Sequence, residues 1–126
     1  MKKLLSLIIL SMLVCFSAQA EEKVYSIDET KKCAKDETLL CDLDGSLITG
    51  YFKEYYSDGT LWYEKPYKDG KRDGVHKEYF IDGTLWIEHP YKDGKEDGVV
   101  KEYHENGTLA RELYYENGKN IKEIRH

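Results

Sequence analysis

Polar and apolar positions alternate through most of the chain, in short runs that end at Asp-Gly or Asn-Gly. One alternating segment, residues 75–80, is bounded by Gly74 and by the pair Asp82-Gly83. The next, residues 85–91, ends before the pair Asp93-Gly94. A period of two is typical of a β-strand, and no segment shows the 3.6-residue period of a helix. Asp-Gly or Asn-Gly between β-prone runs is a strong signal for a hairpin turn. The pattern therefore predicts a series of β-hairpins.

The same segment recurs three times at a fixed spacing. DGTLW stands at residues 58–62 and 82–86, and NGTLA stands at residues 106–110. A fixed period of this kind indicates a repeat architecture. We expect repeats at residues 50–73, 74–97 and 98–120, within a repeat domain at residues 44–126. Glycines recur every 24 residues, and the expected structural turns are Gly59, Gly70, Gly74, Gly83, Gly94, Gly98, Gly107 and Gly118.

A two-residue loop at Asp58-Gly59 predicts which residues lie opposite each other in each hairpin. Charges would then pair across the strands, as Lys53 with Glu64, Lys77 with Glu88 and Lys101 with Glu112. The same register pairs Tyr55 with Trp62, Tyr79 with Trp86 and Tyr103 with Ala110. Cross-strand pairs contribute about 0.2–1 kcal/mol each. The expected fold is all-β, a single-layer antiparallel β-meander of three tandem 24-residue hairpin repeats, with a four-residue turn and a bulge as the alternative local geometry.

The first 20 residues have the pattern of a secretory signal peptide. Lys2 and Lys3 precede an apolar run at residues 4–16, and small residues follow at Ala18 and Ala20. We predict a signal helix that is cleaved after Ala20, because the run is shorter than the roughly 20 residues that span a bilayer. An uncleaved anchor and acylation at Cys15 are the weaker alternatives. The chain is therefore expected to be exported, periplasmic or extracellular, and to meet a membrane only through the signal peptide before cleavage.

Cleavage would leave residues 21–126, the size of one domain. Without Lys2 and Lys3 this chain has 17 basic and 24 acidic residues, a formal charge of −7. An acidic chain has no general attraction for nucleic acid or anionic lipid, so no nucleic-acid partner is expected. The two remaining cysteines, Cys33 and Cys41, predict a disulfide within a capping segment at residues 21–43, since an even count in an exported chain favours pairing. Two free thiols are the alternative.

Candidate chemistry is sparse. Nucleophilic catalysis needs a nucleophile beside a base, and no Gly-x-Ser-x-Gly elbow occurs. His76 should face His89, but zinc sites use three or four ligands. Paired carboxylates can hydrolyse glycosides, yet the two glutamate columns recur in every repeat, as structural positions do: Glu54, Glu78 and Glu102, and Glu64, Glu88 and Glu112. We therefore predict no catalytic residue, no metal site, no cofactor and no enzyme.

An aromatic surface is the candidate binding site. Aromatic residues beside charges are common at protein interfaces, and flat rings also stack on sugars. The predicted surface consists of Tyr51, Tyr55, Trp62, Tyr79 and Trp86. The alternative is that these residues form the thin core of a single-layer sheet.

Two spacings together resemble the bacterial variant of the MORN repeat. Tyr-x-x-x-Gly-x-Leu stands at residues 55–61, 79–85 and 103–109, and Tyr-x-x-Gly-Lys-x-x-Gly stands at residues 67–74 and 91–98. The third copy, from Tyr115 to Lys119, lacks the final glycine. The resemblance covers residues 44–120 and implies a single-layer β-meander without shared catalytic residues. Members are often labelled antitoxin-like. Choline-binding cell-wall repeats and the Tyr-Asp repeats of large toxins are the minor alternatives.

These observations predict an exported, non-enzymatic repeat module that binds a protein partner or a cell-envelope component on an extended β surface. An antitoxin-like inhibitor of a partner toxin is one alternative. Binding or hydrolysis of an envelope polymer such as a glycan is another. The sequence names neither the ligand nor the oligomeric state.

Export gives the first testable prediction. Protein recovered from its native host should begin at Glu21, because signal peptidase reads the small residues at Ala18 and Ala20. Intact-mass spectrometry measures this directly. A mass that retains Met1 would contradict export and would remove the basis for the expected disulfide.

Overall fold

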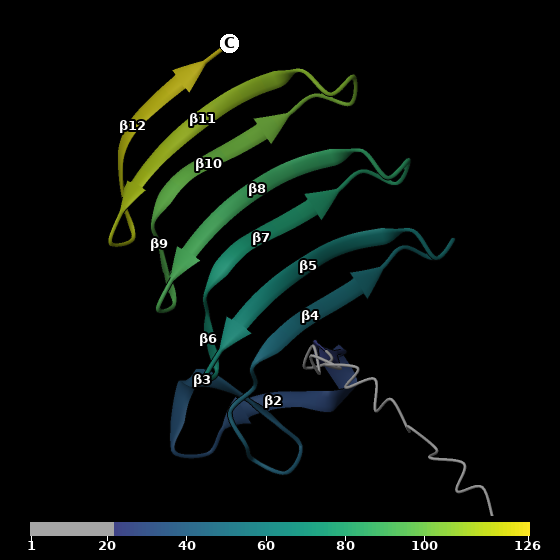
Figure 1. The fold of residues 1–126 in the computed structure, drawn as a ribbon, viewed down its shortest axis with the longest axis vertical. Helices are drawn as coiled ribbons and strands as arrows, with labels where there is room; N and C mark the ends of the chain where they lie inside the picture. The colour runs from purple at the N-terminus through teal and green to yellow at the C-terminus, as the bar shows by residue number, and fades with distance from the viewer. Residues whose placement is uncertain (1–21) are drawn as a thin grey trace, which may run out of the picture.

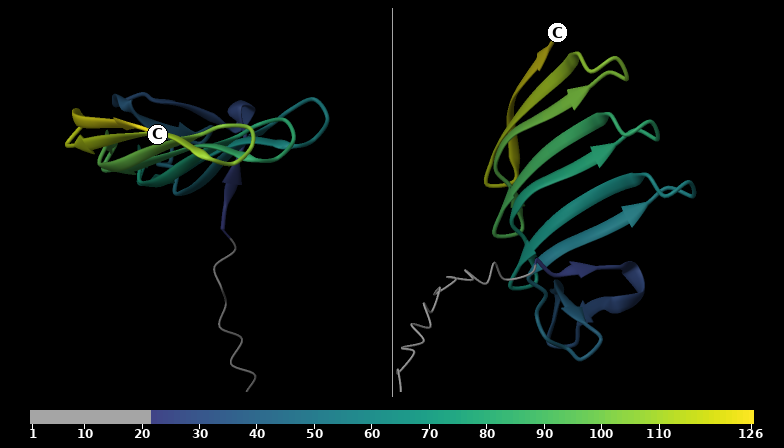
Figure 2. Two further views of the ribbon diagram at one scale, coloured as in Figure 1. Left: turned by 90° about the horizontal axis from the view of Figure 1, so that it is seen from above. Right: turned by 45° about the vertical axis from the view of Figure 1, so that its right-hand side comes forward.

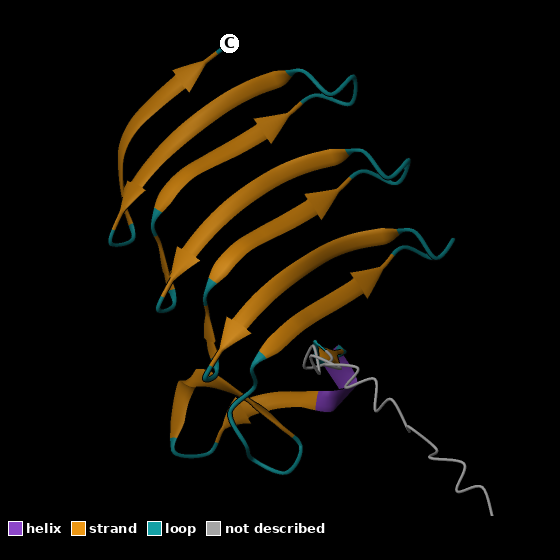
Figure 3. Cartoon of the chain, in the orientation of Figure 1, coloured by secondary structure: helices purple, strands orange, loops and turns teal. Residues whose placement is uncertain are grey.

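The computed structural model describes residues 22–126, so the predicted signal helix lies outside the described residues. The described chain is almost entirely β-strand, with one 3-10 turn at Ile27–Glu29 (Figure 3). Its first strands are β1 (Val24–Tyr25), β2 (Thr30–Cys33) and β3 (Asp36–Asp42). Three hairpins follow, formed by β4 (Gly50–Tyr55) with β5 (Leu61–Lys68), β7 (Gly74–Tyr79) with β8 (Leu85–Lys92), and β10 (Gly98–Tyr103) with β11 (Leu109–Glu116). The short strands β6 (Lys71–Arg72) and β9 (Lys95–Glu96) connect them, and β12 (Lys119–Arg125) ends the sheet.

The repeats form one sheet in chain order, β1-β4-β5-β7-β8-β10-β11-β12 (Figure 1). Seen from above, the hairpins make a single thin, twisted layer (Figure 2, left). This confirms the predicted all-β meander. One pairing differs from the expected antiparallel pattern, because β1 runs parallel to β4. β2 and β3 form a separate two-stranded hairpin at the N-terminal end of the layer.

The charge register is confirmed in all three hairpins. Lys53 lies opposite Glu64, and the equivalent pairs are Lys77 with Glu88 and Lys101 with Glu112. The aromatic pairing was wrong, because Tyr55 lies opposite Leu61 rather than Trp62. Tyr79 and Tyr103 likewise lie opposite Leu85 and Leu109, not Trp86 and Ala110.

The cause is a three-residue loop followed by a bulge. Tyr56 and Thr60 close the first loop through a 2.8 Å backbone hydrogen bond, and Gly59 N donates to Tyr56 O at 2.9 Å. This is a type I turn with glycine in the left-handed region, where Gly59 has φ +87°. The loop shifts the register by one residue, and the bulge at Trp62 shifts it back before Tyr63. The charge pairs are therefore the same with or without the two shifts.

Two-residue loops occur at the opposite edge of the sheet. Asp69 and Gly70 both have positive φ between the paired residues Lys68 and Lys71, as a type I′ turn requires. Equivalent turns lie at Asp93-Gly94 and Asn117-Gly118. Gly74 and Gly98 differ from the prediction because they begin β7 and β10 instead of occupying turns. A neighbouring proline explains why glycine stands at both positions, since a Cβ on Gly74 would lie 3.0 Å from Pro66 Cγ and a Cβ on Gly98 would lie 3.0 Å from Pro90 Cγ.

The two-residue turns are bonded to one another along this edge. Gly94 N donates to Arg72 O at 2.8 Å, and Gly118 N donates to Glu96 O at 2.8 Å. In the first repeat, Gly70 N donates to Ile48 O at 2.8 Å. Ile48 lies between β3 and β4, so the chain just before the first hairpin supplies the contact that a preceding repeat would make.

The N-terminal segment covers the first hairpin. Its β2–β3 hairpin is closed by a disulfide between Cys33 and Cys41, whose Cα atoms are 5.2 Å apart. Tyr25, Ile48 and Phe52 form a buried cluster, with Leu40, Tyr63 and Tyr67 packed against it. The cluster gives the first repeat an apolar neighbour on the side where no repeat precedes it. This segment therefore caps the N-terminal end of the sheet.

The turn geometry generates a second prediction. Gly83→Val should lower the free energy of unfolding by about 1–3 kcal/mol, because a β-branched residue is strained at positive φ. A Cβ at Gly83 meets no atom within 4 Å, so the loss would come from the backbone alone. Urea unfolding measures the change, with Ile81→Val in the same exposed loop as the control. Equal midpoints for the two variants would contradict this turn geometry.

Candidate functional site

The two faces of the repeat sheet differ in whether their residue types recur from repeat to repeat. We call the face of Lys53, Glu64 and Tyr79 the ladder face, because lysine, glutamate and tyrosine recur at these three positions in each repeat. We call the face of Phe52, His76 and Val100 the variable face. Three of its positions change from repeat to repeat: Phe52, His76 and Val100; Lys65, His89 and Leu113; Tyr63, Ile87 and Arg111. The strand registers place each of these sets on one face.

Hydrogen bonds on the ladder face join each repeat to the next. Tyr79 donates its hydroxyl to Glu64 Oε1 at 3.2 Å, and Tyr103 donates to Glu88 Oε2 at 3.0 Å. His126 Nε2 lies 3.1 Å from Glu112 Oε2, so the C-terminal residue completes the series. Burial and the charge of Glu64 raise the pKa of Tyr79 to about 12, which keeps the hydroxyl protonated as a donor. These residues hold the repeats together.

The glutamate columns have structural partners. Lys53 Nζ lies 3.4 Å from Glu64 Oε2, so Glu64 contacts both its own hairpin and the next one. In the other column, Arg111 donates to both carboxylate oxygens of Glu102, from Nε to Oε2 at 3.1 Å and from Nη2 to Oε1 at 2.5 Å. A bidentate pair of this kind fixes the orientation of the carboxylate. The columns therefore act as structural positions in this sheet.

The centre of the variable face forms a thin core. Phe52, His76 and Val100 are only 8%, 5% and 3% exposed. Tyr25, Ile48 and Leu40 of the N-terminal part of the chain pack against Phe52. Long neighbours cover the rest of the row. Lys65 Nζ lies 3.9 Å from the centre of the Tyr63 ring, and the Tyr91 and His89 ring centres are 4.7 Å apart. This row corresponds to the thin-core alternative, but with residues other than the predicted aromatic set.

A pair of histidines lies in the middle of this row. The rings of His76 and His89 are nearly parallel, with centres 6.3 Å apart. Burial lowers the pKa of His76 to about 3, and the positive charges of Lys65, Arg72 and His89 act in the same direction. Glu78 Oε1 lies 3.2 Å from His76 Nε2, but outside hydrogen-bond geometry, so both ring nitrogens lack a hydrogen-bond partner among residues 22–126. Burial and the three cations lower the pKa of His76 in spite of this one carboxylate. The ring is a neutral core residue.

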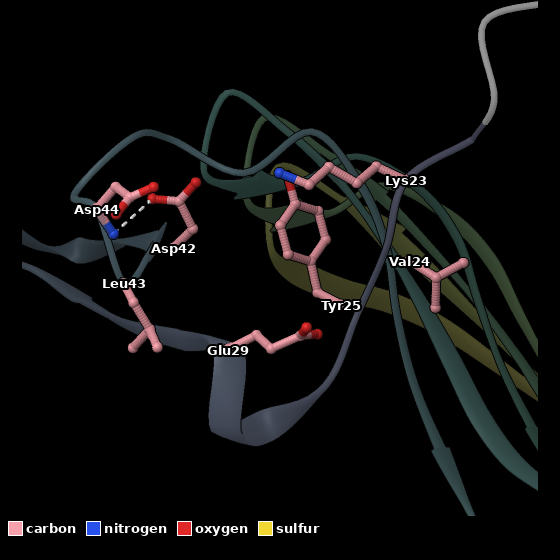
Figure 4. A pocket seen from close by; sticks show the side chains of 7 residues that line it. All are labelled: Lys23, Val24, Tyr25, Glu29, Asp42, Leu43 and Asp44. Carbon is pink, nitrogen blue, oxygen red and sulfur yellow. Dashed lines mark hydrogen bonds between the residues drawn. The ribbon is translucent and has the colours of Figure 1, made fainter.

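The described residues contain no group of three or more His, Cys, Asp or Glu that could hold a metal ion. Two hollows lie in the N-terminal cap, away from both faces of the repeats. One of about 200 Å³ lies beside Tyr25, where Lys23 Nζ is 4.8 Å from the ring centre (Figure 4). Asp42 and Asp44 line one side of it and are hydrogen-bonded to each other, since Asp44 N donates to Asp42 Oδ1 at 3.1 Å. Ligand pockets are usually 300–1,000 Å³. An open hollow of about 540 Å³ lies against the disulfide and is lined by Ala34, Leu39 and Leu47 among others.

The predicted aromatic surface is split between the two faces. Tyr51, Tyr55 and Tyr79 share the ladder face by register. Trp62 does not, because its ring centre lies 4.9 Å from that of Tyr63 on the variable face. Adjacent residues of a regular strand point to opposite faces, so the bulge turns the Trp62 side chain over. Trp86 occupies the same bulge position in the second repeat.

The structure pairs each tryptophan with an aromatic residue that the predicted set omitted. The ring centres of Tyr56 and Trp62 are 5.8 Å apart, and those of Phe80 and Trp86 are 5.7 Å apart, with 34° between the planes in both pairs. The tryptophans are 42% and 39% exposed. The sequence contains a signal for these pairs, since an aromatic residue stands six positions before each tryptophan. The third repeat has His104 and Ala110 instead, so the pairs end after two repeats.

Fold and faces together define an open-ended sheet of β-hairpin repeats. A family model described as MORN repeat variant matches residues 48–69, 72–93 and 96–117, which is just over half of the 126 residues. The chain belongs to this family. Comparisons with curated proteins and with solved structures gave no match. MORN repeats are generally modules that bind proteins or membranes. No helix within residues 22–126 is long and apolar enough to cross a membrane.

The buried histidine generates a third prediction. Stability should fall as the pH drops from about 6.5 towards 3, because unfolded His76 takes up a proton that the folded ring does not. His76→Val, which copies Val100, should reduce this slope by up to one proton, roughly 1.4 kcal/mol per pH unit. Urea unfolding at a series of pH values measures it. His104→Ala, at an exposed position, should leave the slope unchanged. An unaltered slope in His76→Val would contradict the assignment.

Proposed function

We propose that this protein is an exported, non-catalytic repeat module that binds a protein or polymer component of the cell envelope on its variable face. The observation that carries the proposal is the pair of exposed tryptophans, Trp62 and Trp86, which the two bulges place on that face. Equivalent residues on the ladder face are engaged in holding the repeats together, as Tyr79 is with Glu64.

Repeat sheets suit this role because each repeat contributes the same kind of position to one extended surface. Tryptophan and tyrosine are enriched among the residues that dominate binding energy. The two aromatic pairs have nearly identical geometry, so they present two equivalent contact points. A partner that contacts one pair can therefore contact the other in the same way.

Export and the lack of catalysis are parts of the same proposal. The basic, apolar and small residues of positions 1–20 support export. The Cys33–Cys41 disulfide supports it too, since structural disulfides persist in oxidising compartments. The glutamates that a hydrolase would need have structural partners, as Glu64 does in Lys53 and Tyr79.

A capture experiment tests this function. The exported protein, immobilised and exposed to envelope extract, should retain a component that the double variant Trp62→Ser with Trp86→Ser retains at least about thirtyfold less, as removal of a hot-spot residue does. The matched control is Val75→Ser on the ladder face, which changes an apolar residue that is 41% exposed. Urea unfolding confirms that all the variants fold.

Equal retention by wild type and the tryptophan variant would contradict the proposal. So would loss of retention in Val75→Ser alone, because that result would assign binding to the ladder face.

A further inference from the structure

The two aromatic pairs form platforms with nearly the same ring geometry, although Phe80 in the second pair lacks the hydroxyl of Tyr56. Trp62 packs beside Tyr56, whose hydroxyl donates to the backbone oxygen of Tyr79 at 2.7 Å and so fixes the ring to the next repeat. Trp86 packs beside Phe80 with the same 34° between the ring planes. Each tryptophan is held at one edge by its aromatic neighbour, and about two-fifths of its surface is exposed. Ordered, exposed rings bind without the loss of rotamer freedom that weakens many contacts.

The sheet sets the distance between the platforms. Trp62 lies on β5 and Trp86 on β8, which are separated by β7. Neighbouring strands lie about 4.7–4.9 Å apart, so equivalent positions two strands apart recur at about 9.5 Å. A ligand that contacts both rings in the same way must repeat its own structure at nearly this distance. The surface of a folded protein does not in general repeat in this way.

A β-1,4-linked glycan meets this requirement. Its sugar rings are joined through equatorial bonds on opposite sides of each chair, so the chain is extended and every second ring presents the same face. The length of such a disaccharide closely matches the spacing of the two platforms. The axial C–H groups of each sugar form an apolar surface that packs on the electron-rich face of an indole ring.

The charges near the platforms favour a neutral chain. Asp58 and Asp82 lie in the loops that follow Tyr56 and Phe80, and hydrogen bonds from Thr60 and Thr84 lower the pKa of each carboxyl group. Ionised carboxylates repel polyanions but accept hydrogen bonds from sugar hydroxyls. The formal charge of the whole chain, −5, acts in the same direction.

We propose that Trp62 and Trp86 stack on alternate sugars of a neutral β-1,4-linked glycan of the glucose or N-acetylglucosamine type. This rests on the proposed function and names the ligand class of its variable face. The third repeat has Ala110 at the bulge, so the site spans two platforms and its shortest full ligand is a trisaccharide. The sheet twists by roughly 40–50° over two strands, which suits a single soluble chain better than a flat crystalline surface.

Titration of the exported protein tests this proposal, with calorimetry and tryptophan fluorescence as the readouts. The ligands are N-acetylchitobiose, N-acetylchitotriose and N-acetylchitohexaose. The trisaccharide should bind about tenfold more tightly than the disaccharide, because only the longer chain contacts both rings. Trp62→Ala and Trp86→Ala should each remove that gain and leave disaccharide binding weak. Trp86→Phe should retain part of the gain, since the smaller ring still stacks. Tyr55→Ala, at a 55% exposed position on the ladder face, should bind as wild type does.

Maltohexaose, an α-1,4-linked and curved chain of similar length, is the negative control. Equal affinity for the disaccharide and the trisaccharide, or for maltohexaose and N-acetylchitohexaose, would overturn the proposal. A lack of glycan binding would overturn it alone if envelope capture still depended on Trp62 and Trp86. A lack of both would overturn the proposed function as well.

Discussion

Contact between successive hairpins is the interaction on which this fold depends, because a single-layer sheet has no second layer to pack against. Backbone pairing of β5 with β7 and of β8 with β10 joins each hairpin to the next, and three further kinds of contact add to it. The tight turns are bonded along one edge, as Gly94 N is to Arg72 O, and tyrosine hydroxyls bind glutamates on the ladder face, as Tyr79 binds Glu64. Long side chains on the variable face cover a row of small buried positions around His76. An isolated hairpin is marginally stable in water, so these contacts provide the cooperativity of the sheet.

The need for contact between hairpins also explains how the two ends of the sheet are closed and why its two faces differ. At the N-terminal end, Ile48 O accepts the bond from Gly70 that a preceding repeat would accept, and at the C-terminal end His126 takes the position of the next tyrosine beside Glu112. The turn glycines, tyrosines and glutamates that form these hydrogen bonds recur in all three repeats, whereas the long side chains of the variable face differ between repeats. The side chains of the bulge residues Trp62 and Trp86 are 42% and 39% exposed, which leaves them available for a ligand.

The sequence predicted the architecture but not the side on which the tryptophans lie. The spacing of the glycines and the pairing of Lys77 with Glu88 followed from the pattern, because both depend on counts along the chain. The three-residue loop and the bulge were missed because their register shifts cancel, so the charge pairs are identical in either geometry. The burial of His76 was also missed, although the aligned repeats place it in a column with Phe52 and Val100, two apolar residues. The set of binding residues depends on the face of the sheet to which each side chain points. The bulges change that face for the tryptophans, so periodicity alone could not predict the set.

Tyrosine–glutamate hydrogen bonds between repeats stabilise the sheet. The most direct measurement compares the urea unfolding of Tyr79→Phe with that of Tyr55→Phe. Tyr79 donates to Glu64, whereas Tyr55 is the first tyrosine of the series and is 55% exposed. Removal of one hydroxyl should therefore lower the free energy of unfolding by about 1 kcal/mol in Tyr79→Phe and leave it nearly unchanged in Tyr55→Phe. Equal unfolding midpoints for the two variants would contradict the claim.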